Sequence, residues 1–232
     1  MKKIFAHIRW AYATLIIFVA LTLSIILFPF LKAPRSQKIS AKFIQLLTWF
    51  SIEVIGKEDP EARMFLLNHQ SDLDIEIMEL VVKRRLTWVA KKELFDVPFF
   101  GLALKLPEDI AVERENKKSL LKLLKDAKDR LDKGRTLVIF PEGTRSKGEK
   151  MLPFKSGAKL IADKFSLKVQ PVVLIDTKEC YDVKRMIYTP RKIKVIFLDS
   201  FVADKNDPDW LKNLREKMQK VYDEHSNNSS NR

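Results

Sequence analysis

The sequence predicts an α/β domain in which helices flank a β-sheet, preceded by a two-helix motif that binds a membrane. Three observations lead to this prediction. A stretch of 22 residues without a charge, 10–31, lies near the N-terminus; short apolar runs alternate with amphipathic helices after residue 57; and two polar loops directly follow two of the apolar runs. Alternating strands and helices are typical of α/β domains, whose sites lie at the strand ends.

The composition indicates a folded chain with one sizeable core. Of the 232 residues, 46% are hydrophobic and 31% are charged, which excludes disorder as the main state because disordered chains have low hydrophobicity. The net charge of +13 indicates an anionic partner such as nucleic acid, a phosphorylated metabolite or an acidic membrane. Cys180 is the single cysteine, so an intramolecular disulfide and a multi-cysteine zinc site are excluded.

The uncharged stretch is long enough to form a membrane helix. At about 1.5 Å per residue it would extend roughly 33 Å, against a hydrocarbon core of about 30 Å. It exceeds the apolar region of a secretory signal peptide, and residues 30–34 contain no small-residue cleavage site. A buried core helix is the alternative, but no periodic polar face interrupts the run. We therefore expect a retained membrane anchor.

Positive charges flank this helix on both sides, so its orientation stays open. Basic flanks normally remain in the cytoplasm, which allows a helix that dips into one leaflet as well as one that spans. The following segment, 41–55, has an apolar helical face that consists of Phe43, Leu46, Leu47, Phe50 and Val54. We expect a two-helix membrane anchor over 1–56, an α/β domain over 57–225 and a polar tail over 226–232.

The remaining elements follow from short apolar runs and helical periodicity. Strands are predicted at residues 64–67, 86–90, 110–112, 136–140, 169–175 and 193–198. Amphipathic helices are predicted at 117–131, followed by Gly134 as a helix-ending residue, and at 209–224. The basic run 83–85 is expected to face a membrane or solvent.

The first polar loop, residues 68–74, follows the strand at 64–67 and contains His69 and Asp74. Five residues apart, the two side chains diverge by about 140° on a continuous helix. They can pair if His69 lies in the loop and Asp74 lies in the first turn of a helix capped by Ser71 or Asp72. The carboxylate would then fix one imidazole nitrogen and leave the other as a general base. A structural capping loop is the alternative interpretation.

The second polar loop, residues 140–146, follows the strand at 136–140 and reads FPEGTRS. A turn of this kind projects backbone N–H groups and polar side chains into a cleft. Arg145 offers a planar group suited to phosphate, and Thr144 and Ser146 offer hydroxyl donors. By itself this is an ordinary turn, and its occurrence beside the histidine loop supports a functional site.

Together the two loops resemble the first and third blocks of the glycerolipid acyltransferases, and in particular the bacterial 1-acyl-sn-glycerol-3-phosphate acyltransferases. The similarity covers about residues 60–180 and includes AKKELF at 90–95, PFFG at 98–101 and VQPV at 169–172. The second block departs from the family pattern of a strand that ends in Asp-Arg. Here it ends in Glu113-Arg114, so Arg114 fits the block and Glu113 does not.

The resemblance implies a mixed β-sheet flanked by helices and the transfer of a fatty acyl group to a glycerol-phosphate hydroxyl, giving phosphatidic acid. His69 would deprotonate the acceptor and Asp74 would orient its imidazole, with no acyl-enzyme, metal or cofactor. The acceptor would be bound by Lys91, Arg114, Glu142, Gly143, Thr144 and Arg145. The partners implied are acyl-CoA or acyl carrier protein as donor, lysophosphatidic acid as acceptor, and the anionic lipids of the cytoplasmic (inner) membrane, with the catalytic domain on the cytoplasmic face.

Two alternatives stay open. A related acyltransferase could use another acceptor, such as glycerol-3-phosphate, another lysophospholipid or a lipid A precursor. The other alternative is a basic membrane adaptor without catalysis. Nucleic acid is not an expected partner, because the aromatic residues lie in apolar runs instead of alternating with basic residues on an exposed face.

Overall fold

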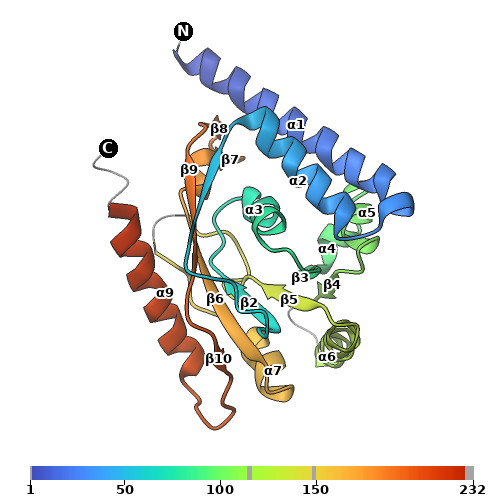
Figure 1. Cartoon of the computed structure of the whole chain (residues 1–232), viewed down its shortest axis with the longest axis vertical. Helices are drawn as coiled ribbons and strands as arrows, with labels where there is room; N and C mark the ends of the chain where they lie inside the picture. Colours follow the sequence, from blue (N-terminus) through green and yellow to red (C-terminus); the bar gives the residue numbers. More distant parts are fainter. Residues whose placement is uncertain (1, 114–116, 148–149, 228–232) are drawn as a thin grey trace.

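A computed structural model of the chain, which describes residues 2–113, 117–147 and 150–227, has a mixed sheet with helices on both faces (Figure 1). The strands are β1 (Ser51–Ile55), β2 (Met64–Leu67), β3 (Leu86–Lys91), β4 (Ile110–Val112), β5 (Thr136–Ile139), β6 (Lys168–Ile175), β9 (Lys192–Phe197) and β10 (Phe201–Val202). Their order is β1-β9-β6-β2-β5-β3-β4, with β10 paired to β6. The predicted α/β class and the strands at 64–67 and 110–112 are confirmed, and the strand predicted over 136–140 ends one residue earlier, at Ile139.

Most strand pairs are parallel, and β6 pairs antiparallel with β9 and β10. A separate hairpin consists of β7 (Tyr181–Asp182) and β8 (Ile187–Tyr188) and follows the short helix α8 (Thr177–Cys180). The central strands β2, β5 and β6 are buried along nearly their whole length, because helices cover both faces of the sheet.

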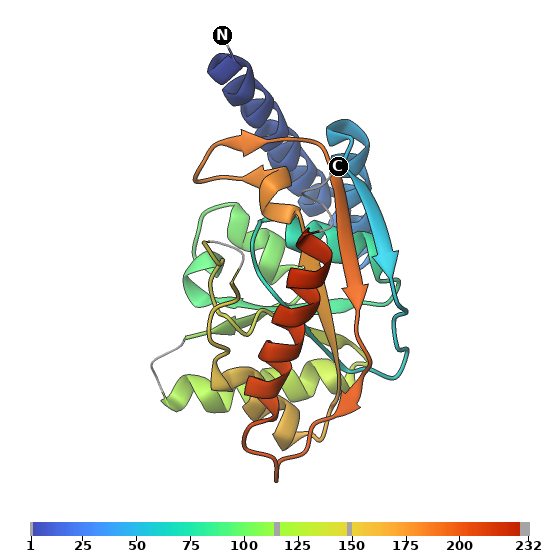
Figure 2. The same cartoon turned by 90° about the vertical axis from the view of Figure 1, so that its left-hand side faces the viewer.

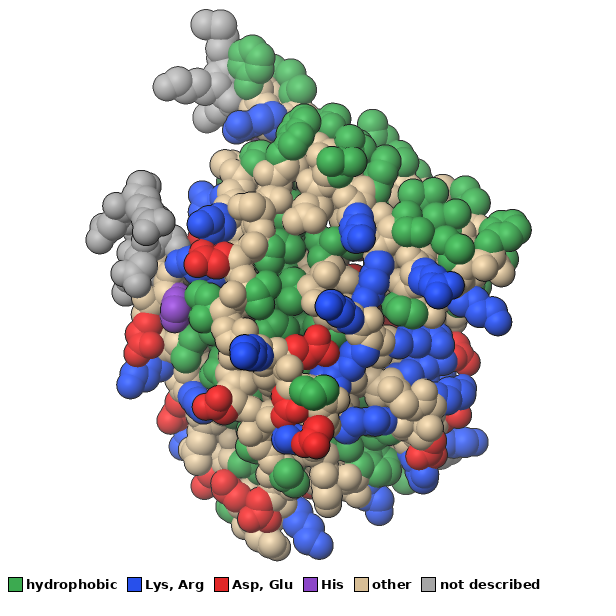
Figure 3. Space-filling view, viewed as in Figure 1, with side chains coloured by type: hydrophobic (Ala, Val, Ile, Leu, Met, Phe, Trp, Pro, Cys, Tyr) green, Lys and Arg blue, Asp and Glu red, His purple; other side chains and the backbone are tan. Residues whose placement is uncertain are grey.

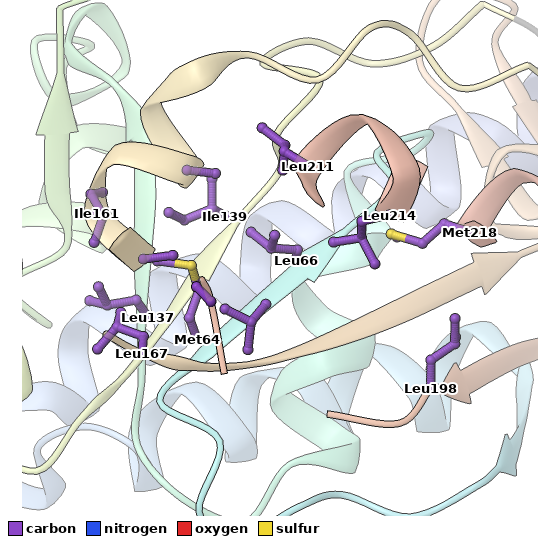
Figure 4. Close-up of a cluster of buried hydrophobic side chains, with 14 of the residues drawn as sticks. Met64, Leu66, Leu137, Ile139, Ile161, Leu167, Leu198, Leu211, Leu214 and Met218 are labelled. Carbon is purple, nitrogen blue, oxygen red and sulfur yellow. The ribbon is translucent and has the colours of Figure 1, made fainter. Parts of the chain in front are cut away.

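One face of the sheet is covered by α6 (Lys117–Asp132), α7 (Ser156–Lys164) and the C-terminal α9 (Trp210–Asn227). Side chains alternate along each strand, so Met64 and Leu66 of β2 point to this face and pack against Leu214 and Met218 of α9 and Ile161 of α7 in one core cluster (Figure 4). The predicted helices at 117–131 and 209–224 are confirmed within a few residues.

The opposite face is covered by α1 (Lys2–Leu31), α2 (Arg35–Thr48) and α3 (Leu73–Val81). The short helix α5 (Phe100–Lys105) lies beside α1, and α4 (Lys92–Phe95) packs against α5 (Figure 1). Phe65 and Leu67 of β2 point to this side. The two faces therefore hold separate core clusters, and β2 carries the catalytic histidine candidate at its C-terminal end between them.

Helix α1 exposes its large apolar side chains and buries small ones. Ala13 and Ala20 are fully buried against the domain, whereas Phe5, Leu15 and Phe30 are more than half exposed. Only 6% of its most apolar window is buried, and the helix is long and apolar enough to cross a membrane. A core helix is therefore excluded for α1, and membrane association is indicated. Hydrophobic side chains gather over α1 and α2, with lysines and arginines below them on the same face (Figure 3).

The predicted helix over 41–55 is wrong at its C-terminal part. Helix α2 ends at Thr48, and Trp49 adopts a left-handed conformation with φ of 53°. Residues 51–55 form β1, which pairs in parallel with β9 at the edge of the sheet. Val54 therefore lies on a strand of the main sheet, not on a membrane-facing helix.

The basic run 83–85 is also different from the expected solvated or membrane-facing segment. Arg84 donates hydrogen bonds to the carbonyl oxygens of Asp59, Pro60 and Ala62 at 2.7–2.8 Å and forms an ion pair with Glu58. Arg85 donates to the carbonyl oxygen of Pro107. Both arginines thus fasten loops at one end of the sheet.

Candidate active site

His69 is positioned by the C-terminal end of β2. The residue before it, Asn68, is buried and bridges to β6, where its side chain donates to the carbonyl oxygen of Leu174 at 2.8 Å and accepts the Leu174 N–H at 2.7 Å. This pair of hydrogen bonds continues the contact between the two strands past their paired residues. The loop that holds His69 therefore starts from a rigid position.

The predicted pairing of His69 with Asp74 is confirmed. Helix α3 begins at Leu73, so Asp74 lies in its first turn while His69 lies in the loop. The Nδ1 atom of His69 lies 2.8 Å from Oδ2 of Asp74, and the same oxygen accepts the backbone N–H groups of Gln70 at 2.8 Å and Ser71 at 3.0 Å. Asp74 is completely buried and His69 is 17% exposed. The Asp74 carboxylate fixes both the loop and the imidazole tautomer, which leaves Nε2 to act as a base.

Ser71 also fixes the loop, although not as the N-cap residue. Asp72 occupies the N-cap position without a capping hydrogen bond. The Ser71 hydroxyl donates to the carbonyl oxygen of Tyr181 at 2.6 Å and accepts the Leu73 N–H at 3.3 Å. A further bond joins the Gln70 side chain to the hydroxyl of Tyr222 on α9 at 3.1 Å. Residues 68–71, which we call the catalytic loop for the role proposed for His69 below, are thus fastened to the β7–β8 hairpin and to the C-terminal helix.

The second polar loop lies against the first because β2 and β5 are adjacent parallel strands, with Leu66 opposite Ile139. The N–H of Ser146 donates to the carbonyl oxygen of His69 at 2.8 Å. Gly143 has φ of 71°, and its N–H closes the turn on the carbonyl oxygen of Phe140 at 2.9 Å. The two polar loops therefore form one site, as the sequence pattern predicts.

Glu142 is a further link between the loops. Its side chain is buried, and one carboxylate oxygen accepts the His69 N–H at 2.9 Å while the other accepts the Leu152 N–H at 2.7 Å. Burial raises the pKa of Glu142 above its ordinary value, and these two hydrogen bonds oppose that shift. The side chain is 1% exposed and both of its oxygens bond to the backbone, so Glu142 positions the two loops.

An aromatic contact to the histidine was not predicted from the sequence. The Phe140 ring stacks on the His69 imidazole with centroids 3.9 Å apart and planes 16° apart. The ring of Trp88 on β3 stacks in turn on Phe140, with ring centroids 5.5 Å apart. Trp88 is fixed in turn because its Nε1–H donates to Glu79 at 3.0 Å. The sequence signal for this contact is the aromatic residue Phe140 at the end of the predicted strand, directly before the turn at 141–143.

The residues predicted to bind the acceptor lie at different places relative to His69 and Asp74. Arg145 forms an ion pair with Asp72, next to the catalytic loop, and Thr144 is exposed on the same turn. Lys91 ends β3, is half exposed and lies 3.0 Å from Glu93, while Lys92 lies 3.1 Å from Glu113. Arg114 lies outside the residues that the structure describes.

Cysteine chemistry and metal binding find little support in the residues that the structure describes. Cys180 is fully buried, and burial raises the pKa of its thiol to about 12, which makes it a poor nucleophile. Across residues 2–113, 117–147 and 150–227 the structure contains no group of three or more His, Cys, Asp or Glu side chains that could hold a metal ion.

Comparison with known proteins identifies the relatives of this chain. A family model described as acyltransferase matches residues 51–175. A 1-acyl-sn-glycerol-3-phosphate acyltransferase from Helicobacter pylori is 42% identical over 223 residues, which are 94% of each chain. A protein of the same name from Saccharomyces cerevisiae is 30% identical over 70% of this chain and 57% of its own length.

A solved structure supports the fold independently. The crystal structure of the 1-acyl-sn-glycerophosphate (LPA) acyltransferase PlsC from Thermotoga maritima superposes with a TM-score of 0.78 and covers 97% of both chains. The sequences are 23% identical, so this likeness concerns the arrangement of the elements, including the N-terminal helices.

Proposed function

Because the chain belongs to the acyltransferase family, we propose that it transfers a fatty acyl group from an acyl thioester to the free hydroxyl of 1-acyl-sn-glycerol-3-phosphate and forms phosphatidic acid. The name of its 42% identical relative, which it matches over 94% of both chains, supports this acceptor. The observation that carries the proposed chemistry is the 2.8 Å contact between His69 Nδ1 and the buried carboxylate of Asp74.

The proposed reaction is a direct transfer. Nε2 of His69 takes the proton of the acceptor hydroxyl while the hydroxyl oxygen attacks the thioester carbonyl carbon. The C–S bond then breaks, and the imidazolium returns the proton to the leaving thiolate. Asp74 stabilises the imidazolium during this step without taking the proton. General-base catalysis supplies about 10²–10⁴-fold of the rate, so positioning of the substrates must supply the remainder.

The acceptor phosphate is proposed to bind at the turn beside His69. In lysophosphatidic acid the phosphate lies on the carbon next to the one that carries the free hydroxyl, so its site must be close to the base. Arg145 meets this condition, since its partner Asp72 follows the catalytic loop and a phosphate can replace that carboxylate. The N–H and hydroxyl of Thr144 are proposed as further contacts, together with Lys91, Arg114 and the close backbone approach that Gly143 permits.

We also propose that α1 enters one leaflet and that the catalytic domain faces the cytoplasm. Support comes from contacts between the middle of α1 and the domain. The Thr14 hydroxyl lies 3.0 Å from the Tyr181 hydroxyl, and Phe18 packs on Phe99 with ring centroids 5.6 Å apart. A helix that crosses the bilayer away from the domain would lose these contacts. Thiol labelling of single cysteines placed within residues 1–8 tests this, and labelling from the periplasmic side would contradict it.

The acceptor is tested by assaying the purified full chain in detergent with lysophosphatidic acid and glycerol-3-phosphate offered separately. Phosphatidic acid formed from lysophosphatidic acid supports the proposal. Acylation of glycerol-3-phosphate alone would retain the mechanism and replace the acceptor. The donor, acyl-CoA or acyl carrier protein, is determined in the same assay.

A further inference from the structure

A basic pocket opens beside the catalytic loop, between this loop and the β7–β8 hairpin. Its volume is about 200 Å³, and its buried floor includes Ser71 of the catalytic loop and Tyr181 of β7. The hairpin projects next to α1 (Figure 2), and the Tyr181 hydroxyl lies 3.0 Å from that of Thr14. The pocket therefore lies between the proposed base and the membrane helix.

The side chains around this pocket are mostly positive. Five of them are cationic, namely Arg145, Lys147, Lys178, Lys184 and Arg185. Among the described residues that line the pocket, Asp182 is the one carboxylate, and it accepts the backbone N–H of Arg185 at 3.0 Å, which shapes the turn. Arg145 is already paired with Asp72, and the other four cations around this small cavity repel one another unless an anion neutralises them.

The hairpin cations are distinct from the proposed acceptor site. Arg145 is paired with Asp72 beside the catalytic loop, and a single phosphate next to the reacting hydroxyl occupies that position. Lys184 and Arg185 instead lie at the exposed tip of the hairpin, outside the sequence blocks that resemble the family. A second anion, farther from the reacting atoms and carrying several charges, fits this side of the pocket.

We propose that the hairpin side of this pocket binds the phosphate groups of coenzyme A in the acyl donor, an inference that rests on the proposed function. In an acyl-CoA the pantetheine arm separates the thioester from a diphosphate and a 3′-phosphate. Lys184 and Arg185, which lie away from the proposed base, can therefore contact these phosphates while the thioester lies at His69. The concave site with a buried floor favours discrete phosphates over an acidic protein surface, which would require a broad exposed face.

A binding experiment that needs no acyl transfer tests this site directly. The full chain in uncharged detergent is titrated calorimetrically with adenosine 3′,5′-bisphosphate, the nucleotide end of coenzyme A. Lys184→Glu combined with Arg185→Glu should weaken binding by about tenfold or more, because two attractive charges become repulsive. The matched control, Lys212→Glu combined with Lys217→Glu, changes the net charge equally on exposed positions of α9 and should leave the Kd within about twofold.

Steady-state kinetics identify which substrate uses the pocket. The hairpin variant should raise the KM for acyl-CoA by about tenfold, with a much smaller effect on the KM for lysophosphatidic acid. An equal increase in both KM values, failure of the parent chain to bind the bisphosphate, or an effect confined to acyl carrier protein as donor would each overturn the inference. If the parent chain binds the bisphosphate but acylates neither acceptor, the proposed function fails while the nucleotide site stands.

Discussion

The imidazole of His69 lies flat on the ring of Phe140, with ring centroids 3.9 Å apart and planes 16° apart. Phe140 belongs to the loop after β5, and His69 belongs to the loop after β2. The stack therefore couples the two polar loops through the side chain that carries the proposed chemistry. An aromatic face also stabilises a cation above it, so the contact favours the imidazolium that forms during the proposed reaction.

Replacing Phe140 with leucine removes this stack and keeps an apolar side chain. We expect kcat to fall by about fivefold, since cation–π contacts of this kind contribute on the order of 1 kcal/mol. Phe65→Leu is the control because Phe65, a fully buried phenylalanine of the neighbouring strand β2, packs against Phe197 instead of His69. Similar losses of kcat in both variants, measured well below their unfolding temperatures, would show that the stack has no specific role.

Asp74→Asn keeps the size of the side chain and removes its charge. The Asp74 oxygen now fixes the imidazole and two backbone N–H groups, and an amide cannot stabilise the imidazolium to the same degree. We expect kcat to fall by about 10²–10⁴-fold with a modest change in the KM of either substrate. Thermal unfolding of the variant is the control, and kcat close to the parent value in a stably folded variant would contradict the assigned role.

Glu142→Gln tests whether this side chain acts through the loops. One carboxylate oxygen would become an NH₂ group facing a backbone N–H, so the bond to either His69 or Leu152 is lost. We expect a lower unfolding temperature and a lower kcat, since leaving a buried N–H without an acceptor costs about 1–3 kcal/mol. A large rise in the acceptor KM with unchanged kcat and stability would instead indicate direct contact with the substrate.

The buried carboxyl of Glu79 predicts a pH dependence of stability. Burial raises its pKa to about 7, although the Trp88 hydrogen bond opposes the shift. Because the pKa of Glu79 is higher in the folded state than in the unfolded state, its contribution to the free energy of unfolding is fully present below pH 4.5. This contribution is lost as the pH rises through about 7. Glu79→Gln should therefore reduce the decrease in unfolding free energy between about pH 5 and pH 8 by roughly 2–3 kcal/mol.

Thermal or denaturant unfolding at the two pH values measures this effect. Some pH dependence should persist in the variant, because burial also raises the pKa of Glu76 to about 8. Glu216→Gln, on the exposed face of α9, is the control and should match the parent. An unchanged slope in Glu79→Gln would mean that this carboxyl is ionised in the folded protein.

The parts of the fold that the sequence predicts best are those with a strong local signal. Strands β2 and β5 are short apolar runs, and α6 and α9 have clear helical periodicity. Strand β1 was missed because Phe50 and Val54 continue the three- and four-residue spacing of α2. The break comes from Trp49, whose left-handed φ of 53° has no signal in a residue of this type.

The active site was predicted in its residues but not in its contacts. The pairing of His69 with Asp74 could be predicted because it depends only on local structure: His69 lies in a loop, and Asp74 lies in the first turn of the helix that begins at Leu73. The contacts of His69 with Phe140 and Glu142 depend instead on β2 and β5 being neighbours in the sheet, which the order along the chain does not reveal. Arg84 was similarly misjudged, since a basic run looks the same in sequence whether it is solvated or holds three carbonyl oxygens.

The central claim is that His69 is the base of an acyl transfer to lysophosphatidic acid. The most direct measurement compares the parent chain with His69→Ala in detergent, using a long-chain acyl thioester and lysophosphatidic acid, after both proteins are shown to unfold at similar temperatures. The account predicts phosphatidic acid from the parent and a loss of at least about 10²-fold in the variant. Phosphatidic acid formed by His69→Ala at close to the parental rate would contradict it.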